Sequence, residues 1–371
     1  MYFSQLQLLQ FRNYPELELE FSPGINAFTG PNGSGKTNIL DALHYLAFTR
    51  GFRSSQDQQA VMEGKTFFFT VGKVVREEAE LIQCNYVKGK GKKLLVNQTQ
   101  VERMSDHIGE IPLVAVLPQD TDLINGPSAT RRQFLDMLIS QYSRDYLHHL
   151  IQYNRLIAQR NALLKMMGEQ RYFDPDQVAL YDAQLIPHGQ AIYSAREQFV
   201  TSYLPAFSRY FERIVSDKEA PYLRYRSQLK ENTTAAWEAL FEEKMEKDRV
   251  NQYTSAGIQR DDLVFSIDEH SVRHFGSQGQ QKTFVIALKL AQYELLAREK
   301  GFAPLLLLDD LFDKLDRHRL GSIGSILQEE IKGQVFITDT SYERLRPLFP
   351  AEGERSPRYF DVQDAVVTPR S

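Results

Sequence analysis

Eight consecutive residues near the start of the chain constrain its fold more than any other stretch. They match the pattern G-x-x-x-x-G-K-[ST] of a phosphate-binding loop and read Gly30, Pro31, Asn32, Gly33, Ser34, Gly35, Lys36 and Thr37. Glycines let the backbone take conformations that side chains block, so successive N–H groups can point at phosphate oxygens. Lys36 is placed to reach the β- and γ-phosphates, and Thr37 offers a hydroxyl to Mg²⁺. We call these residues the P-loop.

The residues on either side of the P-loop have the patterns that such a loop needs. Residues 25–29 predict a short strand, and residues 38–46 predict an amphipathic helix. The N-terminus of that helix, beginning at Asn38, would face a bound anion and attract it through its dipole. An ordinary glycine-rich turn is the alternative. The strand and the helix favour a nucleotide site that includes Asn38.

Composition narrows the class of protein. The chain has 371 residues, enough for two or three domains, and its 42% hydrophobic and 25% charged residues are ordinary for a globular protein. The single cysteine, Cys84, cannot form an internal disulfide, which fits a reducing compartment. We find neither a signal-peptide pattern nor an apolar run long enough to span a membrane, so we expect a cytoplasmic protein with no membrane partner. The net charge of −4 argues against DNA binding through overall charge but permits a local basic face.

Periodicity divides the rest of the chain into strands and helices. Residues 2–29 predict three strands, residues 66–101 a β meander, and residues 111–118 a buried strand that ends at Gln119. From residue 131 to about 215 the apolar spacing becomes helical, which predicts an antiparallel helical arm. We therefore divide the chain into an N-terminal lobe part at 1–126, an inserted helical arm at 127–250, and a C-terminal lobe part at 251–371.

Two groups of basic residues lie near these elements, and each has two interpretations. Lys88, Lys90, Lys92 and Lys93 occupy a turn of the meander, where they could contact a DNA backbone or serve as a solubilising turn. Two arginines that follow the P-loop helix, Arg50 and Arg53, could face phosphate or nucleic acid, or they could belong to a solvated loop.

A second set of candidate site residues lies in the C-terminal part of the chain. Residues 305–308 are four leucines followed by Asp309 and Asp310, which predicts a buried strand with carboxylates at the edge where ligands bind in open α/β sheets. There Asp309 would bind Mg²⁺ through water, and Asp310 could orient or deprotonate an attacking water. Upstream, Ser277 can cap a helix whose N-terminus, with Gly279, forms a second anion-binding end; a plain helix cap is the alternative.

Together these motifs resemble the split ABC-type ATPase heads of the SMC and RecN kind, and the length of the arm is most similar to the RecF family. The resemblance extends over most of the chain. The residues that carry it are Phe11-Arg12-Asn13-Tyr14, the P-loop with Asn38, Phe52-Arg53, Pro127, Arg131 through Asp136, Arg260-Asp261-Asp262, Ser277 through Gln281, Leu308-Asp309-Asp310 and Leu315-Asp316. One departure is the segment Gly257-Ile258-Gln259-Arg260, which lacks the proline and histidine of the family pattern.

The resemblance implies a fold and a set of site roles. The fold would be an α/β ABC-type P-loop ATPase head with a mixed sheet, flanking antiparallel strands and the inserted arm. Two ATP molecules would lie between two copies of the chain, and each P-loop would face the other copy's signature helix. The implied roles are catalysis by Lys36 and Asp310, Mg²⁺ binding by Thr37, Asp309 and Gln119, and ATP contacts in trans from Ser277, Gly279 and Gln280. Thr338 occupies the switch position that is histidine in transporters, which implies slow turnover.

The resemblance also implies a biological role. Relatives of this kind bind DNA under ATP control in recombinational repair and replication, and help to load recombinase at single-strand gaps with RecR and, often, RecO. Expected partners are therefore single-stranded, duplex or gapped DNA, a second copy of the chain, RecR and possibly RecO. Arg155 and Arg160 of the arm join the turn lysines as candidate DNA contacts.

Three other classes of protein share parts of this pattern. A small-molecule P-loop kinase or GTPase would lack the helix that follows Ser277, and a transporter ATPase subunit would carry a histidine in place of Thr338. A long SMC-type protein needs a longer insertion, because about 120 helical residues, rising about 1.5 Å each, cannot form a long coiled coil. Another ABC-type head that is not dedicated to gap repair remains the alternative function.

Overall fold

The computed structural model describes residues 1–54, 56–215, 219–268, 270–312, 315–349 and 355–370. The chain forms two compact units. The first comprises Met1–Asp120, Arg213–Ser216 and Ile286–Ser371, and the second comprises Thr121–Glu212 and Asp217–Val285. Within the described residues, we find no helix both long and apolar enough to cross a membrane.

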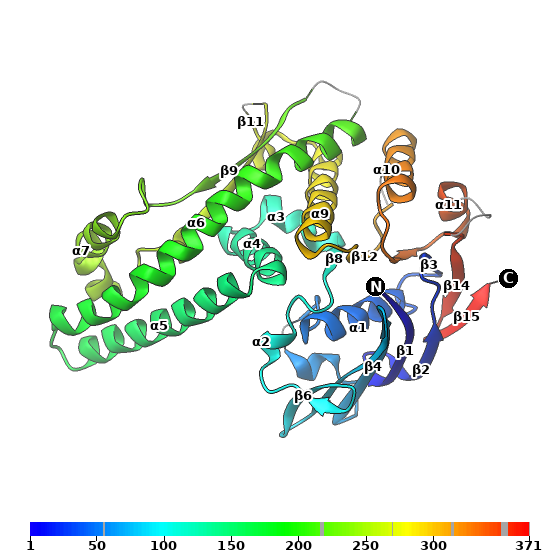
Figure 1. The fold of residues 1–371 in the computed structure, drawn as a ribbon, viewed down its shortest axis with the longest axis horizontal. Coiled ribbons are helices and arrows are strands. Elements are labelled where there is room, and N and C mark those ends of the chain that lie inside the picture. The colour runs from blue at the N-terminus through cyan, green and yellow to red at the C-terminus, as the bar shows by residue number, and fades with distance from the viewer. Residues whose placement is uncertain (55, 216–218, 269, 313–314, 350–354, 371) are drawn as a thin grey trace. The chain divides into compact units, whose positions relative to one another are not determined.

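A mixed six-stranded sheet forms the centre of the first unit (Figure 1). Its order is β15-β14-β3-β13-β12-β8. The bounds are β3 Ile25–Thr29, β8 Leu113–Val116, β12 Leu305–Leu308, β13 Val335–Asp339, β14 Arg358–Gln363 and β15 Val366–Arg370. All of these pair in parallel except β14 with β15. Every residue of β3, β12 and β13 is buried, as expected for parallel strands covered on both faces. Their carboxyl ends therefore meet at one edge.

A second, antiparallel sheet has the order β2-β1-β4-β5-β6-β7. Its strands are β1 Tyr2–Phe11, β2 Tyr14–Glu20, β4 Phe67–Val75, β5 Ala79–Val87, β6 Gly91–Val96 and β7 Thr99–Gln100. Alternating burial along β4 shows that one face is packed and the other open. On the packed face, a Cβ at Gly72 would lie 2.5 Å from the ring of Phe3 and 2.7 Å from the Leu46 side chain. Glycine at this position therefore lets the helix and the neighbouring strand approach β4 closely.

Helix α1 Lys36–Phe48 confirms the helix that was predicted after the P-loop. The other helices of the first unit are α2 Met104–His107, α10 Arg317–Glu329 and α11 Tyr342–Leu345, with 3-10 turns η1 Asp57–Ala60, η2 Pro118–Thr121 and η4 Arg346–Leu348. Asp316 caps α10 by accepting a hydrogen bond from the Arg319 N–H at 2.9 Å. The residues before Leu315 at 313–314 lie outside the described part of the chain.

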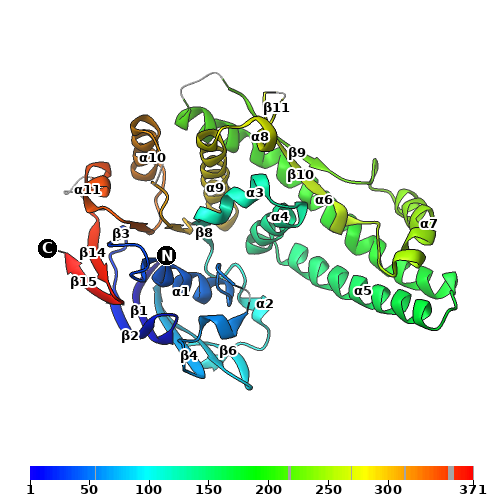
Figure 2. The same cartoon turned by 180° about the vertical axis from the view of Figure 1, so that it is seen from behind.

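The second unit contains the predicted helical arm. Long helices α5 and α6 lie side by side in both views (Figures 1 and 2). The helices are α3 Asp122–Asn125, α4 Ser128–Tyr142, α5 Arg144–Glu169, α6 Pro175–Ile214, α7 Thr234–Asn251 and α8 Val272–Phe275, with η3 Ile258–Arg260. A three-stranded antiparallel sheet of β9 Pro221–Arg226, β10 Asp262–Ile267 and β11 His270–Ser271 accompanies them. Helix α9, Gln278–Lys300, contributes its first residues to this unit and the rest to the first unit.

The arm unit extends further along the chain than the predicted range of 127–250. Pairing of β10 with β9, from Asp262 opposite Arg226 to Ile267 opposite Pro221, brings the following segment into the unit. Arg131 of α4 reinforces this through two hydrogen bonds to the Asp262 carboxylate, at 2.6 and 3.1 Å. The second unit therefore runs to Val285 and includes Ser277.

Arg160 is a core residue of the arm, which corrects the expectation that it contacts DNA. Its side chain is fully buried and bonds the carboxylates of Asp182 at 2.6 Å and Asp248 at 2.7 Å. A third bond goes to the Thr254 hydroxyl at 3.0 Å. Burial raises the pKa of Asp182, so its ionised form depends on the guanidinium. Arg155, by contrast, is exposed.

Replacing Arg160 with leucine should destabilise the arm by about 3–5 kcal/mol, because two buried carboxylates lose their cation. Urea unfolding followed by fluorescence of Trp237 measures this, since this single tryptophan is buried in the same unit. Arg155→Leu on the same helix is the control and should change the free energy of unfolding by less than about 0.5 kcal/mol. Equal effects of the two substitutions would contradict the assignment of Arg160 to the core.

Candidate nucleotide site

The P-loop joins β3 to α1, and its backbone needs glycine at two closely packed positions. Gly35 has a φ of 115°, and a Cβ there would lie 2.6 Å from the Tyr14 hydroxyl. Gly30 has a φ of 154°, and a Cβ there would lie 2.0 Å from the carbonyl oxygen of Val362. The loop is therefore held between β1–β2 residues on one side and β14 on the other. Val362 is distant in sequence from the motif, whereas Tyr14 lies shortly before it.

Lys36 and Ser34 provide the polar groups that suit a phosphate. The ammonium of Lys36 is buried and donates to the carbonyls of Gly30 at 2.8 Å and Pro31 at 2.9 Å. Burial lowers the Lys36 pKa, while the carboxylates of Asp310, Asp309 and Asp339 oppose that shift. The hydroxyl of Ser34 is buried and has no hydrogen-bond partner, which leaves a donor for an anion. The loop therefore fits the phosphates of a nucleotide.

Asp309 brings together the two halves of the predicted site. It follows β12, is almost fully buried, and accepts hydrogen bonds from the hydroxyls of Thr37 and Thr338, both at 2.8 Å to Oδ1. Burial raises the pKa of Asp309, and the two hydroxyls act in the opposite direction. A carboxylate beside a hydroxyl is a ligand set that suits Mg²⁺. Thr37 and Asp309, far apart in sequence, are thus in direct contact.

Asp310 and Gln119 lie at the same edge of the sheet. Asp310 has a φ of 45°, and its backbone N–H donates to the Thr338 hydroxyl at 3.0 Å. Thr338 therefore fixes both acidic residues at once. Gln119 is exposed in η2, directly after β8, which pairs in parallel with β12. Its predicted role as a metal ligand stays a prediction.

The signature segment before α9 forms a reciprocal cap. Ser277 Oγ accepts from the Gln280 N–H at 3.2 Å, and Gln280 Oε1 accepts from the Ser277 N–H at 2.8 Å. The other end of the Gln280 amide donates to Glu219 at 2.6 Å. Ser277 is exposed and Gly279 half-buried. The predicted cap is confirmed, and because the Gln280 side chain already has partners at both ends, its predicted contact with ATP would require these bonds to change.

Comparison with known proteins shows the family. A family model described as the RecF/RecN/SMC N-terminal domain matches residues 2–347. A Flavobacterium johnsoniae protein named DNA replication and repair protein RecF is 43% identical over 349 residues, which are 94% of this chain and 96% of that protein. A protein of the same name from Cytophaga hutchinsonii is 43% identical over 350 residues, covering 94% of this chain and 92% of that one.

The chain belongs to the RecF family. This is a family of ATP-binding ATPases. A solved structure of the recombination mediator protein RecF with ATP, in the RecFOR pathway, matches with a TM-score of 0.89 at 28% identity, over 100% of this chain and 98% of that one. An Smc head domain from Pyrococcus furiosus shares the fold, with a TM-score of 0.57 at 16% identity. The predicted ABC-type head is therefore confirmed.

Sequence reasoning missed Asp339 as a residue of this RecF-family site. It ends β13, is buried, and its carboxylate accepts from the Ser341 N–H at 2.7 Å and lies 3.5 Å from Arg344. Its carbonyl accepts from the Gly30 N–H at 3.3 Å. Burial raises the pKa of Asp339. The available signal was an aspartate at the end of a buried strand, which is similar to the pattern that indicated Asp309.

Contacts around the P-loop helix bear on two predictions about basic residues, those for Arg53 and Lys92. Arg53 donates to Asn38 Oδ1 at 3.1 Å, so it lies beside the nucleotide loop. Lys92 is not at a hairpin tip: it lies within β6, forms an ion pair with Asp57 at 2.9 Å and donates to the Thr49 carbonyl. As a DNA contact Lys92 is therefore the weakest of the four lysines, while Lys88, Lys90 and Lys93 are exposed.

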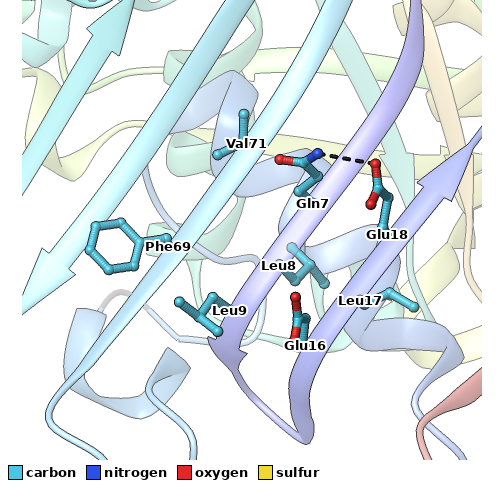
Figure 3. Close-up of a pocket in the computed structure, with 8 residues that line it drawn as sticks. All are labelled: Gln7, Leu8, Leu9, Glu16, Leu17, Glu18, Phe69 and Val71. Atoms are coloured by element: carbon cyan, nitrogen blue, oxygen red, sulfur yellow. Dashed lines mark hydrogen bonds between the residues drawn. The ribbon is translucent and has the colours of Figure 1, made fainter.

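A separate groove of about 300 Å³ lies on the open face of the antiparallel sheet (Figure 3). Leu9, Phe69 and Val71 form part of its lining, and Glu16 and Glu18 add carboxylates. Gln7 bonds Glu18 at 3.1 Å. Two carboxylates without a cation would repel phosphate, so this groove does not fit a nucleotide.

Replacing Thr338 with valine should raise the Mg²⁺ concentration for half-maximal hydrolysis about tenfold, because Asp309 loses a donor that orients it. The acid limb of the rate should also move to higher pH. The native hydroxyl lowers the Asp309 pKa, so without it that pKa rises, and the ionised form is lost earlier as pH falls. Rates measured across Mg²⁺ concentration and pH test both effects. Thr338→Ser keeps the hydroxyl and should behave as the native chain; equal behaviour of Val and Ser would contradict this role.

Proposed function

We propose that this protein is an ATP-dependent DNA-binding protein of recombinational repair and replication that helps to load recombinase at single-strand gaps. The contact of Thr37 with Asp309 carries the proposal, because it completes an ATPase site from two distant motifs. The names of the relatives, DNA replication and repair protein RecF, support the biological setting. So does the solved recombination mediator of the RecFOR pathway.

The chemistry is hydrolysis of ATP to ADP and phosphate. Lys36 would hold the β- and γ-phosphates and offset charge that develops during transfer. Asp310 orients the attacking water and accepts its proton. Mg²⁺, held by Thr37 and by Asp309 through water, would supply further positive charge at the phosphates; Gln119 is a third candidate ligand. Thr338 is neutral and cannot act as a cation, so turnover is slow.

ATP acts in this proposal as a switch for a homodimer. The signature end of α9 is suited to face another copy, because Ser277 is exposed and Phe275, two residues earlier, is 73% exposed. A second chain would cover this apolar side chain while Ser277, Gly279 and Gln280 approach its ATP. The closed dimer is then favoured by the contacts that ATP makes on both chains, and hydrolysis removes them.

DNA and other proteins are the remaining partners. Exposed Lys88, Lys90, Lys93 and Arg155 are candidate contacts to single-stranded, duplex or gapped DNA, which is compatible with the net charge of −4. RecR and possibly RecO are the protein partners that we expect. The setting would be the cytoplasm.

ATP with Mg²⁺ should convert an Asp310→Asn variant to a stable dimer, because ATP binds but the water is no longer activated. Size-exclusion chromatography with light scattering measures the mass. Adding Ser277→Arg should restore the monomer, since the bulky side chain blocks the seam from the other copy. A monomeric Asp310→Asn protein that binds ATP would rule out the sandwich.

Replacing Lys88, Lys90 and Lys93 with glutamine should reduce the salt dependence of DNA binding, with the slope falling by about 0.9 for each phosphate that these lysines no longer neutralise. Fluorescence anisotropy with gapped, single-stranded and duplex DNA, with and without ATP, provides the measurement. The control replaces three exposed lysines elsewhere, Lys65, Lys73 and Lys332, with the same change in charge. An identical slope in both triple variants would return the turn to a solubilising role.

A further inference from the structure

The β14–β15 hairpin lies beside β3, the strand that leads into the P-loop, and its turn reaches the loop itself. β14 pairs in parallel with β3, with Phe360 opposite Phe28 and Asp361 opposite Thr29. The carbonyl oxygen of the next residue, Val362, would be only 2.0 Å from a Cβ atom at Gly30. The hairpin thus begins beside the strand that leads into the P-loop and continues beside the loop itself.

The turn of the hairpin bonds directly to the loop backbone. Asp364 and Ala365 have φ values of 48° and 61°, as in a two-residue hairpin turn with left-handed backbone at both positions. Alanine takes this conformation at a cost, and it persists where surrounding contacts hold it. Here the Ala365 N–H donates to the Ser34 carbonyl at 3.0 Å. That bond fixes one peptide of the P-loop.

Side chains of the hairpin also connect β3 with the segment that follows β13. The Thr29 hydroxyl donates to Asp361 Oδ1 at 3.0 Å, and Arg370 donates to the same oxygen at 3.2 Å. The Arg370 guanidinium also lies over the Tyr342 ring at 3.9 Å. Tyr342 opens α11, shortly after Asp339. Asp361 and Arg370 therefore join two segments, the strand that precedes the P-loop and the residues that follow β13.

We propose that the β14–β15 hairpin is a positioning element of the nucleotide site, with Asp361 and Arg370 as positioning residues that set the affinity for ATP. This deepens the proposed function and rests on ATP binding at the P-loop. A loop already held in its phosphate-binding shape loses less entropy when the nucleotide binds. Within the described part of the chain, these hairpin contacts do not reach Asp309 or Asp310, so we expect the hydrolysis step itself to be unchanged.

The Asp361–Arg370 ion pair should contribute little to folding stability. The side chains of Arg370 and Asp361 are 38% and 48% exposed. Ion pairs with that exposure contribute little to stability. Their effect on ATP binding can therefore be separated from any effect on folding.

The test compares Arg370→Ala with Arg358→Ala. Arg358 lies on the same hairpin and contacts the Phe360 ring at 5.4 Å, so its substitution also removes a guanidinium that lies over an aromatic ring. Arg370→Ala should weaken binding of a fluorescent ATP analogue between about 2-fold and 10-fold, the effect of losing one interaction of this size. Turnover at saturating ATP should change less than about twofold, so KM rises while kcat is retained. Arg358→Ala should change neither.

A second pair of variants tests the Thr29 hydroxyl, which lies 3.0 Å from Asp361 Oδ1 and 3.3 Å from the Phe360 carbonyl oxygen. Thr29→Val removes the hydroxyl but keeps the shape of the side chain, and it should weaken ATP binding to a similar extent. Thr29→Ser keeps the hydroxyl and should bind ATP as the native chain does. If Thr29→Val fails to fold, the exposed Arg370 still decides the matter. Native ATP affinity in Arg370→Ala, or an equal loss in Arg358→Ala, would overturn the proposal. Failure of the unsubstituted protein to bind ATP would instead overturn the proposed function.

Discussion

Two hydroxyl groups hold one buried carboxylate at the centre of the nucleotide site. Thr37 of α1 and Thr338 at the end of β13 donate to the same oxygen of Asp309, which follows β12. Burying a carboxylate without partners costs several kcal/mol, and pairing it with a cation would cancel its charge. Two neutral donors stabilise the carboxylate and leave its charge for a bound cation. The positions of three elements therefore depend on an acceptor that is also suited to the ligand.

In the second unit, buried carboxylates are instead paired with buried guanidinium groups. Arg160 contacts two carboxylates at 2.6 and 2.7 Å, and Arg196 lies 2.8 Å from Asp136 and 3.5 Å from Asp261. These charges are satisfied by one another, so they confer geometry and offer nothing to a ligand. The first unit also contains a charge pair of this kind, because the buried carboxylate of Asp41 lies 2.8 Å from the Arg12 guanidinium. Asp309 differs from these carboxylates in that hydroxyl groups, and not a guanidinium, are its hydrogen-bond donors.

The sequence was most informative where a motif is local. The P-loop, the acids after four leucines and the arm helices were all predictable, because spacing within a few residues determines each. Arg160 was misassigned because its partners Asp182 and Asp248 are 22 and 88 positions away. Asp361 was missed for a similar reason, because it contacts Thr29 across 332 positions. The pairing of β10 with β9 likewise joins residues 262–267 to residues 221–226, which are far apart in the sequence. Such contacts depend on sheet topology, which periodicity does not reveal.

Two features of the site bear on the turnover rate of the proposed ATPase. Thr338 offers a hydroxyl at the switch position, so it can orient Asp309 and Asp310 but cannot add positive charge in the transition state. The hairpin contacts to Thr29 and Ser34 act on the loop before any bond breaks, so they strengthen binding of the ground state and the transition state alike. Uniform binding of this kind raises occupancy without raising kcat. In the function that we propose, a site built in this way would keep its ATP bound for long periods, so that the presence of the nucleotide, rather than its turnover, would carry the signal.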